Sequence, residues 1–136
     1  FVSGTSLKMI EEFKKEMASK FDMTDLGKLT YYLEVQFDQH EQGISLSHER
    51  YALKIIDEAR MKNCNSIHIP MDSGPKSKAE DEKEVDATWY RKNIGCFQYL
   101  LHTRPDMSYC TGVLSRYMQS LRDSHGIAMK QCLRYL

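Results

Sequence analysis

The stretch that decides the fold of this chain is residues 87–102, Ala-Thr-Trp-Tyr-Arg-Lys-Asn-Ile-Gly-Cys-Phe-Gln-Tyr-Leu-Leu-His. Apolar side chains recur along it at three- or four-residue spacing, at Tyr90, Ile94, Phe97 and Leu101. This is the repeat of one face of an α-helix. Arg91, Gly95 and Tyr99 are one turn apart and share a different face. The stretch therefore predicts an amphipathic helix whose second face carries a cation, a glycine and an aromatic ring.

Two more helices are predicted after this stretch. Pro105 interrupts the pattern, because it disfavours helix at Arg104 and suits the first turn of a new helix. The apolar stripe of that second helix is Met107, Cys110, Leu114, Tyr117 and Met118. A third helix is expected to open at Asp123 or Ser124. Its stripe is Met129, Cys132 and Leu136. The residues from 87 to 136 thus predict an all-helical segment.

The N-terminal residues predict a strand end followed by a helix. Phe1–Gly4 is expected to end a strand, and Thr5 or Ser6 is expected to cap the helix. The apolar positions of that helix are Leu7, Ile10, Phe13, Met17 and Phe21. Since the chain opens on Phe1 rather than methionine, a fragment of a longer protein is expected.

A β-hairpin and another helix are predicted next. Residues 29–37 alternate in side-chain character, as strands do. Residues 39–43 form a turn motif before the returning strand Ile44–Leu46. Ser47 is expected to cap a helix with the apolar face Tyr51, Ala52, Ile55, Ile56 and Ala59. An extended segment over 64–71 and a mobile, charge-rich loop over 72–86 complete this half.

Composition is that of one globular domain. The chain has 136 residues, of which 41% are hydrophobic and 28% charged, so neither disorder nor a membrane span is indicated. None of the four cysteines forms a Cys-x-x-Cys pair. Cys96, Cys110 and Cys132 fall within apolar helical patterns, which predicts buried free thiols in a reducing, intracellular compartment.

Charge is unevenly distributed although the net charge is zero. The net charge is −2 over residues 1–71, −3 over 72–86 and +5 over 87–136. A basic C-terminal segment is what a phosphate backbone attracts. The alternative is a helical bundle with solvated arginine and lysine side chains.

Short motifs occur in a fixed order along the whole chain. In the first half they are Phe21-Asp22-Met23-Thr24-Asp25-Leu26-Gly27, Tyr31-Tyr32-Leu33, Gly43-Ile44, Tyr51-Ala52 and Pro70-Met71. In the second half they are Tyr90-Arg91-Lys92-Asn93-Ile94-Gly95, Thr103-Arg104-Pro105-Asp106, Leu114-Ser115-Arg116-Tyr117-Met118, Ser124-His125 and Leu133-Arg134-Tyr135-Leu136. The ordered set resembles the C-terminal half of the reverse transcriptase domain of copia-type retrotransposon Pol polyproteins.

The resemblance implies an α+β fold in two parts. Residues 1–47 would be the C-terminal part of the palm, an N-terminal helix and a primer-positioning-like hairpin. Residues 48–136 would be thumb-like helices, with the mobile charged loop at about 72–86. The implied function is that of a fragment of an RNA-directed DNA polymerase that positions primer–template duplex. The implied partners are an RNA–DNA or DNA duplex and the palm, fingers and RNase H domains of the same polyprotein, with no membrane.

Five residues are candidates for nucleic-acid binding on this resemblance: Arg91, Lys92, Gly95, Tyr99 and Arg116. Gly95 fits the place where a thumb helix comes closest to the duplex, because glycine lets a backbone approach. Arginine and lysine would meet phosphates, and Tyr99 would pack on sugars. The alternatives are close helix–helix packing for Gly95 and a core position for Tyr99.

No catalytic or metal-binding residue is predicted. The family holds its magnesium ions with two aspartates on a Tyr-x-Asp-Asp hairpin, and these would lie upstream of Phe1. Asp22, Asp25, Asp106 and the acidic run 80–86 are expected at the surface or in helix caps. The chain alone is therefore predicted to be inactive as a polymerase. The alternatives are a residual nucleic-acid-binding module and an inert structural or interaction relic.

Some positions depart from the pattern of this family. Glu34 stands where glycine is usual, and Asn93 where an apolar residue is common. Leu121 takes the place of a proline, and Gly126 that of an aromatic residue. A buried asparagine without partners and a glycine at a helix start both weaken a fold.

Overall fold

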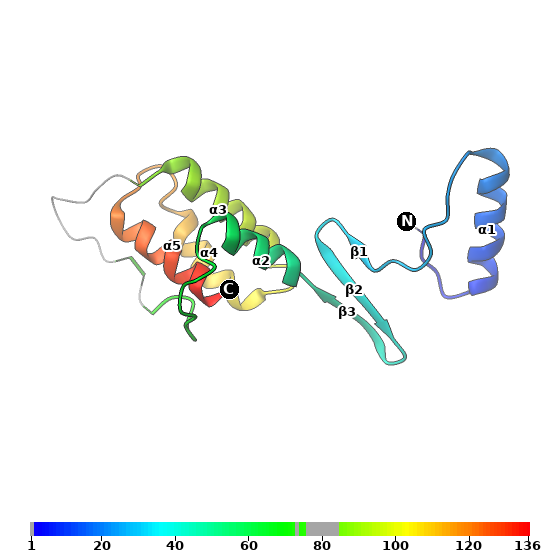
Figure 1. Cartoon of the computed structure of the whole chain (residues 1–136), viewed down its shortest axis with the longest axis horizontal. Helices are drawn as coiled ribbons and strands as arrows, with labels where there is room; N and C mark the ends of the chain where they lie inside the picture. Colours follow the sequence, from blue (N-terminus) through cyan, green and yellow to red (C-terminus); the bar gives the residue numbers. More distant parts are fainter. Residues whose placement is uncertain (1, 73, 76–84) are drawn as a thin grey trace. The chain divides into compact units, whose positions relative to one another are not determined.

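The computed structural model describes residues 2–72, 74–75 and 85–136 (Figure 1). The chain divides into two compact units, Phe1–Thr30 and Tyr31–Leu136. Within the described residues there are five α-helices and one three-stranded antiparallel sheet. The predicted α+β class is therefore confirmed. The division at residue 47 into palm-like and thumb-like parts stays a prediction, and most of the loop predicted over 72–86 lies outside the described residues.

The first unit contains α1 (Leu7–Lys20). The side chain of Ser6 caps it by accepting from the Met9 backbone N–H at 3.5 Å, as one of the two predicted caps. The prediction of a strand end before this helix is wrong, since residues 2–4 belong to no strand. Lys14 pairs with Asp25 at 2.9 Å, which closes the loop after the helix. No residue of α1 is fully buried; in its predicted apolar stripe Ile10 and Met17 are half-buried, whereas Leu7 and Phe13 are exposed.

The second unit opens with the three strands β1 (Tyr31–Tyr32), β2 (Val35–His40) and β3 (Gly43–Ser47), in that order in the sheet. The prediction of one strand over 29–37 is wrong, because the chain reverses at Leu33 and Glu34. Their φ angles are 48° and 65°, and Tyr32 pairs directly with Val35. Two left-handed residues between paired strands are the pattern of a type I′ hairpin turn. The second hairpin, with His40 opposite Gly43, is where it was predicted.

Replacing Glu34 by glycine is expected to stabilise the Tyr31–Leu136 unit. A side chain at a left-handed φ costs energy that glycine avoids, so we expect a gain of about 0.5–1 kcal/mol in the free energy of unfolding. The substitution also removes the exposed Glu34–Lys54 ion pair at 3.2 Å, which reduces the gain slightly. Urea unfolding followed by circular dichroism measures the change. Glu34→Ala is the control, since it loses the carboxylate but keeps the β-carbon; equal destabilisation by both variants would contradict this account.

Helix α2 (Glu49–Glu58) follows the sheet directly. Its N-cap is His48, without a capping side-chain hydrogen bond, so the prediction of Ser47 as the cap is wrong. Ile55 is buried, and the other predicted apolar positions of this helix are half-buried. The predicted face therefore packs on the rest of the unit.

The remaining helices are α3 (Ala87–Leu100), α4 (Ser108–Ser115), which follows the 3-10 turn Pro105–Met107, and α5 (Asp123–Tyr135). Three helices were predicted here, but the second one ends at Ser115, so Tyr117 and Met118 of its predicted stripe lie beyond it. Asp86 caps α3 by accepting from the backbone N–H groups of Thr88 and Trp89. Helices α3, α4 and α5 pack together beside α2 (Figure 1). Their shared core includes side chains with no exposed surface: Tyr90, Phe97, Leu100, Met107, Cys110, Leu114, Met129 and Cys132. The predicted free thiols Cys110 and Cys132 are buried, and Cys96 is half-buried.

Two departures from the family pattern are accommodated in this core. The buried Asn93 donates from Nδ2 to the Trp89 carbonyl at 2.7 Å, which satisfies one of its polar groups. Gly126 is buried, and a β-carbon there would lie 2.9 Å from the Val85 side chain. Val85 thus fills space beside α5 that a larger residue at position 126 would need.

Candidate nucleic-acid interface

Helix α3 presents one face to the core and another to solvent. The core face consists of Tyr90, Asn93, Ile94, Phe97 and Leu100. Arg91, Gly95 and Gln98 are exposed and follow one another at helical spacing. We call these three residues the outer stripe of α3. Gln98 was missed by the sequence analysis, although the spacing of Arg91 and Gly95 could have identified it.

Gly95 is open on this outer stripe. A β-carbon at this position would meet no atom within 4 Å outside its own helix and chain neighbours. The described residues therefore give no helix–helix packing reason for a glycine here. The backbone of α3 is accessible at this point, and an approaching polymer would meet it directly.

Arg91 links the outer stripe to the end of α4. Its Nε and Nη2 donate to the Met118 carbonyl at 3.1 Å and 2.9 Å. Arg116, which caps α4, is exposed and lies two residues before Met118. The structure thus brings Arg91 beside the segment that carries Arg116.

Lys92 lies at the border of α3 with α2. Its Nζ is 2.7 Å from the Glu58 carboxylate, and both side chains are largely exposed. This hydrogen bond raises the pKa of Lys92 above its usual value and lowers that of Glu58. An exposed pair of this kind exchanges readily with solvent, so Lys92 keeps its charge and can change partner.

Tyr99 lies away from the outer stripe. It is half-buried, and its hydroxyl donates to the Leu33 carbonyl in the β1–β2 turn. Its ring packs edge-on against His48 and Tyr51, with centroid distances of 5.0 Å and 5.4 Å. The structure therefore gives Tyr99 a bridging role between α3 and the hairpin. Contact with a sugar stays a prediction for this residue.

No three histidine, cysteine, aspartate or glutamate side chains among the described residues lie close enough together to hold a metal ion. The magnesium ions that the resemblance implies stay an expectation for the parent enzyme. Separately, none of the described helices has the length and apolar character required to cross a bilayer.

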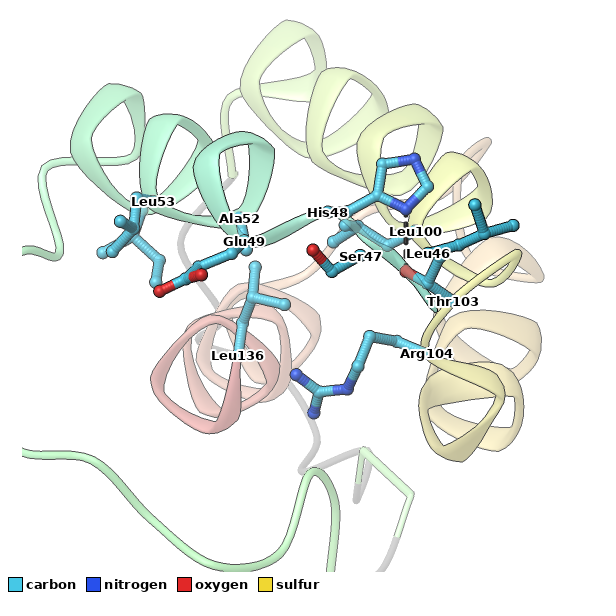
Figure 2. Close-up of a pocket in the computed structure, with 11 residues that line it drawn as sticks. Leu46, Ser47, His48, Glu49, Ala52, Leu53, Leu100, Thr103, Arg104 and Leu136 are labelled. Carbon is cyan, nitrogen blue, oxygen red and sulfur yellow. Dashed lines mark hydrogen bonds between the residues drawn. The ribbon is translucent and has the colours of Figure 1, made fainter. Parts of the chain in front are cut away.

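A pocket of about 280 Å³ lies between the end of β3, the start of α2 and the segment after α3 (Figure 2). Its apolar lining is Leu46, Ala52, Leu53, Ile56, Leu100 and Leu136. Glu49 and Arg104 stand at opposite sides of it in Figure 2. None of the five predicted nucleic-acid-binding residues lines this pocket, so it is separate from the outer stripe.

The sequence of the chain matches a known family. Residues 1–73 match the family described as reverse transcriptase (RNA-dependent DNA polymerase). The chain belongs to this family, and the resemblance to copia-type retrotransposon Pol polyproteins is confirmed by the relatives. No solved structure matches the chain significantly.

The relatives match almost the entire chain. The Retrovirus-related Pol polyprotein from transposon RE2 of Arabidopsis thaliana is 32% identical over 99% of this chain, which spans 9% of that protein. An uncharacterized mitochondrial protein of the same plant is 30% identical over 99% of this chain, which spans 56% of it. The Pol polyprotein from transposon TNT 1-94 of Nicotiana tabacum is 26% identical, and the chain spans 11% of it. The chain thus corresponds to a small part of the Pol polyproteins.

Proposed function

We propose that this chain binds nucleic-acid duplex through the outer stripe of α3, as a non-catalytic part of a reverse transcriptase that positions primer and template. The observation that carries the proposal is the open backbone at Gly95, with Arg91 one turn before it on the same exposed face. Family membership supplies the class of ligand.

The electrostatics of the segment support a polyanionic ligand. Residues 87–136 carry a net charge of +5, whereas the whole chain is neutral. Lysine and arginine that replace counterions on a duplex give binding a steep salt dependence. Contacts of this type position a protein without reading sequence, which suits a segment that holds any primer–template.

The proposed role contains no chemical step of its own. Nucleotidyl transfer needs metal ions held by carboxylates, and no group of three metal-binding side chains occurs among the described residues. We propose that this chemistry belongs to other parts of the polymerase. The residues of α3 and α4 would orient the duplex through Arg91, Lys92 and Arg116.

Titration of a fluorescent RNA–DNA hybrid with the chain across a salt series is expected to show binding that weakens steeply with salt. Arg116→Ala should reduce the slope of log affinity against log salt by about 0.7–0.9, the value for one phosphate contact. Lys15→Ala is the control, since it removes one exposed charge from α1. Absence of binding by a chain shown to be folded would refute the proposed function.

A second candidate is self-association through α1. Leu7 and Phe21 of the predicted apolar stripe are more than 60% exposed, and Phe13 is 43% exposed; exposed apolar patches promote association. Light scattering separates the two candidates. Oligomers without duplex binding would favour self-association, while a monomer that binds the hybrid would favour the interface on α3.

A further inference from the structure

His48 occupies the joint between the β-hairpin and the helices. It follows the last residue of β3 and is the N-cap of α2. Although a joint residue is usually solvated, only 4% of His48 is exposed. Its Nδ1 lies 2.7 Å from the Thr103 hydroxyl oxygen, shown as a dashed line in Figure 2. The side chain of His48 at this joint is therefore bonded to the segment that follows α3.

The ring of His48 also supports the contacts that attach the β1–β2 turn to α3. It packs edge-on against Tyr99 at 5.0 Å and more loosely against Tyr51 at 6.0 Å. Tyr99 in turn donates its hydroxyl to the Leu33 carbonyl in the β1–β2 turn. Displacing the His48 ring would thus disturb the packing that holds Tyr99 in place.

The second ring nitrogen of His48 is not satisfied by a hydrogen bond within the described residues. Nε2 is buried and has no hydrogen-bond partner among the described residues. A neutral ring leaves this atom unsatisfied in either tautomer. A second proton would place a positive charge there, which is much more costly in a buried site without a partner. The site therefore tolerates the neutral ring far better than the charged one.

Few neighbouring groups could compensate that charge. The titratable groups that contact the His48 ring or act on its charge are Glu34, Tyr51, Tyr99 and His102. Glu49 and Arg104 line the pocket that His48 also lines. Glu34 is already engaged by Lys54 and the Tyr31 hydroxyl. Burial, reinforced by the positive charge available to His102, holds the pKa of His48 below its ordinary value of 6.5.

We propose that His48 is an acid-sensitive joint, whose protonation loosens the attachment of the β-hairpin to α2 and α3. The folded pKa of His48 is lowered, so the attached state gains its full stability above about pH 6.5. That stability falls as the pH drops below this value and is lost by the folded pKa. The remaining hairpin contacts, such as the Arg50 backbone N–H to the Gln36 side chain at 3.1 Å, then act alone.

Amide hydrogen exchange of β2 and β3, measured between pH 7.5 and 5 and corrected for intrinsic exchange rates, tests the proposal. Protection should fall as pH drops, by up to about tenfold for each unit by which folding lowers the pKa of His48. The fall should begin near pH 6.5 and level off at the pH where the His48 ring itself titrates, followed by nuclear magnetic resonance of the same intact chain. Loss of protection outside this window, or none at all, would overturn the proposal without any variant.

Variants sharpen the assignment to this one ring. His48→Gln should make hairpin protection independent of pH, because glutamine can still bond Thr103 but does not titrate here. His102→Gln should raise the pH at which protection levels off, because it removes a neighbouring positive charge. His68→Gln, which replaces an exposed histidine, should leave the transition unchanged. A pH response that persists in folded His48→Gln would show that another group controls it.

Discussion

Replacing Phe97 by alanine is expected to destabilise the Tyr31–Leu136 unit by about 3–5 kcal/mol, the range for removing a buried aromatic side chain. Phe97 has no exposed surface and lies in the core shared by α3, α4 and α5. Whole domains have only about 5–15 kcal/mol of stability, so much of the population should unfold at moderate urea concentrations. Urea unfolding followed by circular dichroism measures this loss.

Phe13→Ala on α1 is the matched control for this prediction. It makes the same chemical change at a side chain that is 43% exposed. Because little apolar contact is lost there, we expect a change within about 0.5 kcal/mol. Similar losses in the two variants, or a loss below about 1 kcal/mol for Phe97→Ala, would mean that this core is not packed as described.

The core of the helical segment could be predicted from helical spacing alone. Tyr90, Ile94 and Phe97 were placed on one stripe, and all three are buried. The stripe was predicted to continue at Leu101, yet Leu100 is the fully buried residue and Leu101 is half-buried. Spacings of three and four residues are both compatible with a helix. Only the position of the neighbouring helices decides which leucine is covered.

The β1–β2 turn could not be found from local sequence. Leu33 and Glu34 are not residues that favour a left-handed backbone, so the alternating pattern of 29–37 hid the reversal. The turn is held by tertiary contacts instead, among them the hydrogen bond from the Tyr99 hydroxyl to the Leu33 carbonyl. A bond between residues 66 positions apart leaves no mark in a sequence window.

Only part of the candidate interface could be predicted, because spacing shows which residues are exposed but not which tertiary contacts they make. Exposure of Arg91 and Gly95 follows from their spacing relative to the buried stripe. The position of Tyr99 away from that face does not follow from spacing, because it depends on contacts with the hairpin and with His48. His48 itself carries no sequence motif. Its burial results from how β3 joins α2.

Replacing Gly95 by leucine is expected to separate stability from binding. Glycine in an exposed helix interior costs about 0.8–1 kcal/mol relative to the best helix formers, so the variant should be more stable by a similar amount. The new side chain has open space around it, so no clash offsets this gain. If α3 meets the duplex at Gly95, the same side chain holds the two backbones apart. Affinity for an RNA–DNA hybrid should fall at least about tenfold, which corresponds to 1.4 kcal/mol.

Gly112→Leu provides the matched control on α4. Gly112 is also exposed within a helix, and a β-carbon there would meet nothing within 4 Å. It should therefore raise thermal stability by a comparable amount. Because it lies one turn before Arg116, it should lower hybrid affinity less than Gly95→Leu does. Fluorescence anisotropy measures the hybrid affinity of the two variants, and thermal unfolding measures their stability. Equal affinities for the two variants would remove Gly95 from the interface, because steric exclusion from the duplex is the one respect in which these substitutions should differ.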